Sequence, residues 1–241
     1  MNLTPPWDIH CELLKSLPNL QEVRILRDFD DDEDWPEPGE PISLVRLRRL
    51  YVNDPPCLDY LRVPSLEEVR IGIVIDRDSA ETCRSLDCFL MRSACSPRRL
   101  CIHGLLNAQS TSTILQKYPS FTQIVVTDEG EDDEETLSNF LTLFTLPSAF
   151  PLPHITEVGF ACQNADANLY PLFLDMMDSR RNLEKRPLHV AEFLFLNARL
   201  DPDPRSVARI DTLRAEGLHI SILSEGVARY RMDQSLFKAW T

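Results

Sequence analysis

The amino-acid sequence predicts an α/β fold, namely an irregular solenoid with parallel strands on one face and helices and loops on the other. Two observations lead to this prediction. The spacing apolar-x-x-apolar-x-apolar returns eight times along the 241 residues, and apolar residues at helical spacing lie between the copies. Because a crossover between two parallel strands is right-handed in nearly all proteins, repetition of such a unit stacks the strands in chain order.

Each copy is predicted to form a short strand, because its last two apolar residues are separated by one residue. The clearest copies are LPNLQEVRI (17–25), VPSLEEVRI (63–71), YPSFTQIVV (118–126) and LPHITEVGF (152–160). The looser copies are LVRLRRLYV (44–52), SPRRLCI (96–102), LHVAEFLF (188–195) and AEGLHI (215–220). Since no unit covers its own apolar face, we expect neighbouring units to share one core.

Helices are predicted between the strands, where apolar residues lie three and four positions apart. The longest apolar stripe consists of Leu169, Leu172, Phe173, Met176 and Met177. Similar stripes lie within 86–90 and 137–144, and shorter helical stretches are expected around 9–17, 114–118 and 207–214. In the irregular stretch 197–205, Pro204 is placed where a proline opens a helix at its first turn.

We expect a single domain over residues 1–241, because no segment has the composition of a linker. Two acidic insertions, 28–41 and 128–135, are expected to be solvated loops, since their like charges repel one another. Two other interpretations of the first insertion stay open: an acidic docking segment for a basic partner, and a calcium loop. The calcium loop fits poorly, because Glu33 stands where such a loop needs its glycine. Residues 224–241 are predicted to cap the last repeat.

The composition narrows the class of protein. A hydrophobic content of 43% is enough to bury a sizeable core. A formal charge of −13 and a pI near 4.8 disfavour a nucleic-acid partner, because nucleic acids attract cations. No apolar stretch approaches the roughly 20 residues that span a bilayer. We therefore expect an intracellular protein, cytoplasmic or nuclear, that binds neither nucleic acid nor membrane.

The seven cysteines are interpreted as free, buried thiols in a reducing compartment. Their number is odd and no two of them form a CxxC pair, although a disulfide or a zinc site is the alternative. They are Cys11, Cys57, Cys83, Cys88, Cys95, Cys101 and Cys162.

Motifs of common catalytic sites are absent from the sequence, which contains no phosphate-binding loop and no GxGxxG, HExxH or GxSxG. The histidines are widely separated, so we expect neither a metal site nor a cofactor. They are His10, His103, His154, His189 and His219. Cys101 and His103 share one side of a predicted strand, and we interpret both as structural because no third group is placed to orient the histidine. From the sequence we therefore expect that the protein is not an enzyme.

Stacking the copies in register predicts an exposed strand face with two rows of side chains. The residues between the last two apolar positions are Arg24, Tyr51, Arg70, Cys101, Val125, Gly159, Leu194 and His219. The adjacent row is Glu22, Arg49, Glu68, Arg99, Gln123, Glu157 and Glu192. Guanidinium groups around an aromatic ring favour a protein interface, and the predicted partner-binding residues are Arg24, Tyr51, Arg70, Arg49 and Arg99. The alternating signs also fit a solvated charge ladder across neighbouring strands.

With these strands, the chain resembles the leucine-rich-repeat region of fungal F-box-like proteins. Irregular repeats of that family carry LPxLxxLxI strands followed by segments similar to LDCFLMRSACSPRRLCI (86–102). The resemblance implies that the repeats recognise a protein target on the exposed strand face, while a separate F-box binds the adaptor of a cullin ubiquitin ligase. We detect no F-box in residues 1–241, so adaptor binding is expected only if an F-box lies outside this chain.

These observations together favour a non-enzymatic protein-interaction scaffold resembling the target-recognition repeats of an F-box-like ubiquitin-ligase subunit. Two alternatives stay open. One is an enzyme on an α/β scaffold, and the other is a degenerate structural fragment without a partner.

Overall fold

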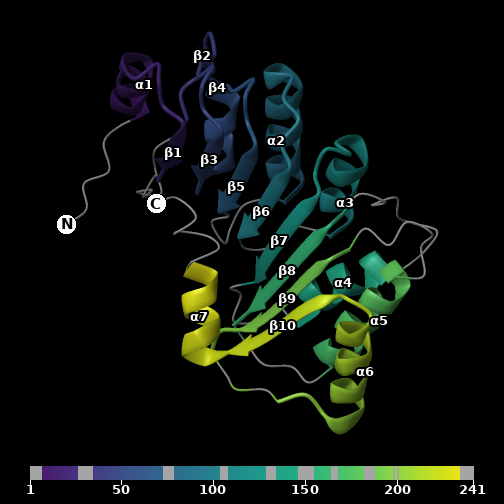
Figure 1. The fold of residues 1–241 in the computed structure, drawn as a ribbon. Helices are drawn as coiled ribbons and strands as arrows, with labels where there is room; N and C mark the ends of the chain where they lie inside the picture. The colour runs from purple at the N-terminus through teal and green to yellow at the C-terminus, as the bar shows by residue number, and fades with distance from the viewer. Residues whose placement is uncertain are drawn as a thin grey trace.

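An eight-stranded parallel sheet, with its strands in chain order, forms the centre of the molecule (Figure 1). The computed structural model describes residues 7–26, 35–72, 79–103, 108–128, 134–145, 155–163, 168–181, 188–197, 199 and 201–233. The strands of the sheet are β1 (Glu22–Ile25), β3 (Arg49–Val52), β5 (Glu68–Gly72), β6 (Arg99–His103), β7 (Gln123–Asp128), β8 (Glu157–Cys162), β9 (Val190–Phe195) and β10 (His219–Ser224). The predicted α/β class, with parallel strands side by side in chain order, is confirmed.

The predicted register is correct from β1 to β8 and wrong for the last two strands. The repeat pattern matches Phe193 with Val158, whereas the structure places Ala191 beside Val158. In β10 the shift runs in the opposite direction. The repeat pattern places Leu218 in line with Val158, whereas the structure places Ile220 there. Both errors amount to two residues, so each side chain still lies on its predicted face of the sheet.

Of the described helices, α2 to α6 cover one face of the sheet (Figure 1). They are α2 (Ser79–Ser93), α3 (Ala108–Lys117), α4 (Glu134–Thr145), α5 (Leu169–Arg181) and α6 (Pro204–Ala215). The helices predicted from the sequence are confirmed, and most are longer than the predicted stretch. α6 begins at Pro204 as expected, and Asp203 caps it by accepting hydrogen bonds from the backbone N–H groups of Arg205 and Ser206. Among the described residues, none of the helices combines the length and apolar character needed to cross a membrane.

One hydrophobic core lies between the sheet and these helices. A chain of aromatic rings runs through it, with centroids 6.4 Å apart for Phe160 and Phe173 and 5.0 Å apart for Phe173 and Phe193. These rings come from β8, α5 and β9, so α5 packs against both neighbouring strands. Full burial of each such side chain contributes about 1.5–3 kcal/mol.

Shorter elements fill the N-terminal edge of the fold. β2 (Ile42–Ser43) pairs in parallel with β4 (Leu61–Arg62), and the 3-10 helix η1 (Pro55–Tyr60) precedes β4. α1 (Trp7–Ser16) packs beside β2. The shortest interval of the repeat pattern, between β3 and β5, therefore holds a 3-10 helix and a two-residue strand in place of an α-helix.

The last described helix, α7 (Glu225–Asp233), lies on the opposite side of the sheet from α2–α6 (Figure 1). Its Ala228 is fully buried and forms a second, small core with Ala161, Leu194 and Leu196. The predicted C-terminal cap, 224–241, is thus described as far as Asp233, and this part lies over the strand face of β9 and β10. Residues 234–241 lie outside the described part of the chain.

The two acidic insertions contain more ordered structure than the predicted solvated loops. Trp35 of the first insertion is half-buried and packs against the aromatic rings of Trp7 and Tyr60. In the second insertion, Asp128 ends β7, and residues 134–135 open α4. Residues 35–41 form no helix or strand, so the first insertion is a loop there, although Trp35 is not fully solvated. The expectation of a loop is corrected at Asp128 and at residues 134–135. Residues 27–34 and 129–133 lie outside the described residues.

The seven cysteines are free thiols, as predicted, but Cys11 and Cys88 are only partly buried, so the expectation of buried thiols is wrong for these two. Five of them are buried, namely Cys57, Cys83, Cys95, Cys101 and Cys162. Burial raises the pKa of Cys83 to about 11, and it raises the pKa of Cys95 to about 11 as well. Thiols of this kind stay protonated at neutral pH and behave as small apolar side chains.

Candidate protein-binding site

The face of the sheet opposite α2–α6, which we call the open face, carries two rows of side chains across the strands. The first row is Glu22, Arg49, Glu68, Arg99, Gln123, Glu157, Val190 and His219. The second row is Arg24, Tyr51, Arg70, Cys101, Val125, Gly159, Glu192 and Ser221. Both predicted rows are correct through β8. The register errors of β9 and β10 place Glu192 and Ser221 in the second row, where Leu194 and His219 are predicted.

Charges of the first row alternate in sign and lie close enough to attract one another. Arg49 Nη1 lies 2.6 Å from Glu22 Oε1, and Arg49 Nε lies 3.9 Å from Glu68 Oε2. Arg99 Nε lies 3.9 Å from Glu68 Oε1, on the other side of the same carboxylate. These contacts form the charge ladder that the alternating signs predict. Arg49 and Arg99 keep part of their side chains exposed, so the ladder leaves both within reach of a partner.

Arg24 and Tyr51 form a cation–π pair at the β1–β3 end of the open face. The Cζ atom of Arg24 lies 5.2 Å from the centroid of the Tyr51 ring. Arg24 is exposed and Tyr51 is half-buried. Gly72 makes room for the ring, because a Cβ atom at this position would lie 3.1 Å from the Tyr51 hydroxyl oxygen. This end of the face offers planar donors beside an aromatic ring, a combination enriched at protein interfaces.

Arg70 is predicted to be exposed, but the structure buries it. Cys101 belongs to the same predicted row, and it is buried as its interpretation as a buried thiol expects. Arg70 is 2% exposed and donates a hydrogen bond from Nε to the carboxylate of Glu68. A buried guanidinium group is stable only when an acceptor of this kind compensates its lost hydration. Burial raises the pKa of the Cys101 thiol although the charges of Arg99 and Arg70 act to lower it. A thiol held in the protonated form beside His103 is a poor nucleophile. The prediction that Arg70 lies on the exposed surface is therefore corrected.

A groove of about 210 Å³ opens on the open face between β6–β9 and α7. The charged residues that line it are Arg99, Glu157, Glu192 and Arg231. Gly159 also lines the groove, and a Cβ atom there would meet Val125 Cγ2 at 3.4 Å, which is an ordinary contact. The absence of a side chain at Gly159 therefore contributes open space without backbone strain.

Arg99 belongs to both the charge ladder and the groove. Burial acts to lower the pKa of Arg99, but the interactions with Cys101, Glu68 and Glu157 outweigh this effect. The pKa of Arg99 is therefore raised. The guanidinium therefore stays cationic at every physiological pH. Its Nε atom is buried and forms no hydrogen bond with a residue in the described part of the chain.

The sequence prediction of the site misses α7 and with it Arg231. Leu194 is predicted to be exposed, but α7 covers it, and only 4% of Leu194 is exposed. Ala228 and Met232 lie four residues apart on the side of α7 that packs on the sheet. This spacing is the signal in the sequence that predicts a helix with one small, packed face in this segment.

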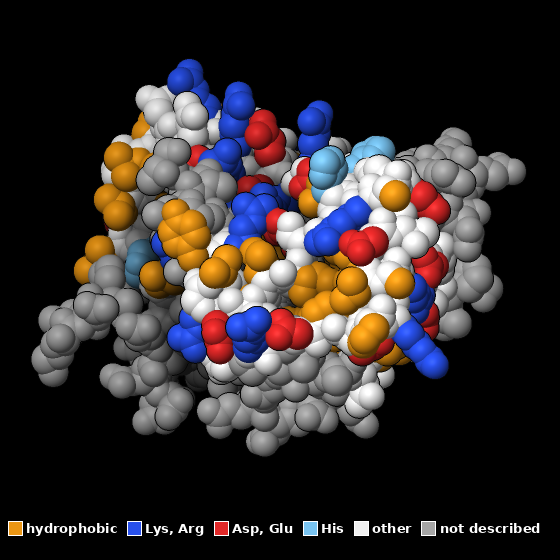
Figure 2. Space-filling view, turned by 60° about the horizontal axis from the view of Figure 1, so that its bottom comes forward, with side chains coloured by type: hydrophobic (Ala, Val, Ile, Leu, Met, Phe, Trp, Pro, Cys, Tyr) orange, Lys and Arg blue, Asp and Glu red, His pale blue; other side chains and the backbone are white. Residues whose placement is uncertain are grey.

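Of the predicted partner-binding residues, Arg24, Tyr51 and Arg49 share the β1–β3 end, Arg99 lines the groove, and Arg70 is buried. The space-filling view shows Lys and Arg side chains among Asp and Glu side chains, with hydrophobic side chains between them (Figure 2). Within the described ranges, no group of three or more His, Cys, Asp and Glu side chains is arranged to hold a metal ion.

Comparisons with known proteins give no match, whether with protein-family models, with curated proteins or with solved structures. The assignment of a function therefore depends on the geometry of the open face.

Proposed function

We propose that this chain is a non-enzymatic scaffold of irregular leucine-rich repeats that binds a protein partner on its open face. In this role it resembles the target-recognition repeats of an F-box-like ubiquitin-ligase subunit. Binding of a cullin-ligase adaptor belongs to the proposal only where an F-box is part of the same protein.

The observation that carries the proposal is the placement of α2–α6 on one side of the sheet. Doubly wound parallel sheets reverse their strand order and cover both faces with helices. Here the strand order never reverses, so right-handed crossovers put these helices on the same face. Among the described helices, only α7 packs on the open face, over the last strands. Repeat proteins use such an uncovered strand face as an extended binding surface.

The side chains of the open face indicate how a partner is held. Arg24 presents planar donors that match a carboxylate or a pair of backbone carbonyls, and Tyr51 adds aromatic contact area. The groove beside Arg99 carries charges of both signs, so a partner that fits it brings complementary charges of both signs. The exposed pair at the β1–β3 end is therefore the first target for mutation.

Affinity purification with quantitative mass spectrometry from cells of the source organism tests the proposal. The tagged chain is compared with the variants Arg24→Glu and Arg205→Glu. Both substitutions change the net charge equally, and Arg205 is exposed on α6, on the helical side of the molecule. We expect a partner that is recovered with the unchanged chain and with Arg205→Glu, and at least about 5-fold less with Arg24→Glu. Equal recovery of the partner with the two variants would exclude the open face as its binding surface.

A further inference from the structure

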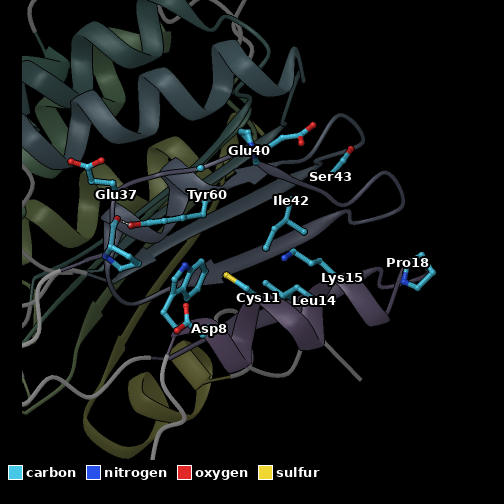
Figure 3. Close-up of a pocket in the computed structure, with 14 residues that line it drawn as sticks. Asp8, Cys11, Leu14, Lys15, Pro18, Glu37, Glu40, Ile42, Ser43 and Tyr60 are labelled. Carbon is cyan, nitrogen blue, oxygen red and sulfur yellow. Dashed lines mark hydrogen bonds between the residues drawn. The ribbon is translucent and has the colours of Figure 1, made fainter.

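A second concave surface lies at the N-terminal edge of the molecule, away from the groove beside Arg99. This pocket measures about 620 Å³ and opens between α1 and the segment 36–43, with Tyr60 of η1 on its wall (Figure 3). We call it the edge groove. Its size falls within the range of sites that hold a ligand of small-molecule size, so it accommodates a short extended segment and not a folded domain.

The aromatic side of the edge groove is built before any ligand binds. The ring centroids of Trp7 and Tyr60 lie 5.0 Å apart, and those of Trp7 and Trp35 also lie 5.0 Å apart. Trp35 donates a hydrogen bond from Nε1 to Asp54 Oδ2 at 2.7 Å, and the Tyr60 hydroxyl donates to the backbone carbonyl of Pro36. These contacts attach the start of the segment 36–43 to the core, so binding does not have to order that wall.

The charge of the edge groove is acidic. Asp8, Glu37 and Glu40 line it and are exposed, and none of them forms an ion pair with a described residue. Lys15 also lines it, but its Nζ atom lies 3.0 Å from Glu12 Oε1 and is thereby partly neutralised. A ligand of complementary charge is therefore a cation.

Trp7 carries a buried hydrogen-bond donor beside the edge groove. This residue lines the groove and is 5% exposed, and its Nε1 atom makes no hydrogen bond within the described residues. Trp7 and Tyr60 are 5% and 7% exposed, so small parts of their rings reach the groove, where they suit the aliphatic stem of an arginine or a lysine.

We propose that the edge groove binds a short, extended, basic segment of a protein partner, with an arginine or lysine side chain between the aromatic wall and the carboxylates of Glu37 and Glu40. This inference concerns a surface separate from the open face, so either proposal can fail without the other.

Selection from a phage-displayed library of random dodecapeptides on the immobilised full chain tests the inference. The same library is selected on the double variant Glu37→Gln/Glu40→Gln and on a control, Glu81→Gln/Asp211→Asn. Glu81 on α2 and Asp211 on α6 are exposed, and the two double variants have the same net charge. We expect arginine and lysine to be enriched on the unchanged chain and on the control, and not on Glu37→Gln/Glu40→Gln.

The most enriched basic peptide is then labelled with fluorescein and titrated by anisotropy. We expect Glu37→Gln/Glu40→Gln to weaken its binding by about 5-fold or more, as the loss of two ion pairs requires, while the control and Arg24→Glu stay within about 2-fold of the unchanged chain. Absence of enrichment of arginine and lysine would overturn the inference. Equal weakening by the control would also overturn it, because the overall charge of the chain would then attract the peptide. Self-association of the chain that Glu37→Gln/Glu40→Gln abolishes would also overturn it, because the occupant would then be a second copy.

Discussion

Arg231 of α7 lies 2.5 Å from Glu192 of β9, measured from Nη2 to Oε1, so an ion pair joins the C-terminal helix to the open face. Two further contacts hold the helix in place. Ala228 is buried in the small core over β8 and β9, and Arg229 donates a hydrogen bond from Nε to the carbonyl of Leu196 at 2.9 Å. Because Arg231 also lines the groove, α7 forms part of the wall of the candidate binding site.

Replacement of Ala228 by aspartate is expected to release α7 without unfolding the sheet. The residue is fully buried in the small core, and an unpaired carboxylate there costs more than the docking of one short helix contributes. Hydrogen–deuterium exchange should show fast exchange throughout α7 and unchanged protection in β5–β8. The control is Ala208→Asp, at an exposed position of α6. Loss of protection across the whole sheet would contradict the separation of the two cores.

Replacement of Gly159 tests whether the groove receives the partner. Gly159→Ala places a Cβ atom in ordinary contact with Val125 and should leave partner binding unchanged. Gly159→Leu projects a longer side chain from the open face into the groove and should reduce binding by about 10-fold. Both variants should unfold at the same or a slightly higher denaturant concentration, since glycine weakens a strand interior. Undiminished capture by Gly159→Leu would show that the partner does not use the groove.

Replacement of Val69 by aspartate is expected to unfold the molecule. Val69 lies on β5 in the main core with no exposed surface, and an unpaired carboxylate there costs several kcal/mol. The matched variant Val45→Asp places the same charge at a position that is 54% exposed, and it should behave like the unchanged chain. Thermal unfolding followed by circular dichroism makes the comparison. A normal transition for Val69→Asp would contradict the observed strand register.

The ion pair between α2 and α3 predicts a stability that depends on pH. The pKa of Asp87 is lowered, because the raising effect of partial burial is outweighed by hydrogen bonds from Lys117 and Tyr118 and by the charge of Lys117. Lys117 Nζ lies 2.7 Å from Asp87 Oδ1. A carboxyl whose folded pKa lies below its unfolded value of about 3.9 stabilises the fold above that pH and loses this effect as the pH falls through the folded pKa.

Urea unfolding of the unchanged chain and of Asp87→Asn measures this effect between about pH 2.5 and pH 7. The difference in unfolding free energy should be constant above about pH 5 and should shrink below about pH 4. A difference that stays constant over the whole range would exclude Asp87 as the titrating group.

The positions of the strands and helices could be predicted from the sequence because their hydrophobic patterns are local. Ile124 and Val126 alternate as a half-buried strand requires, and the stripe from Leu169 to Met177 marks one helix face. The register of β9 could not be predicted from a local pattern in the same way. Its segment offers several apolar residues of the same parity, and the small Ala191, rather than Phe193, continues the row. Both choices bury an apolar side chain, so alternation alone does not distinguish them.

The candidate site was predicted only in part, because burial on the open face depends on contacts between distant segments. Alternation correctly assigns Arg24 and Arg70 to the same face, yet Arg24 is exposed and Arg70 is buried against Glu68. Leu194 is buried because α7 returns across the sheet, and nothing within β9 indicates this return. The edge groove joins α1 to the segment 36–43, so the sequence offered an acidic docking segment within 28–41 as one interpretation but did not predict the groove itself.

Site-specific photo-crosslinking tests most directly whether the open face recognises a protein. p-Benzoylphenylalanine is placed at Tyr51 on the open face and, in a second protein, at Met91, which is 56% exposed on α2 on the helical side. The account predicts a covalent adduct with the captured partner from position 51 and none from position 91. An adduct from position 91 alone, or no adduct from either position, would contradict it.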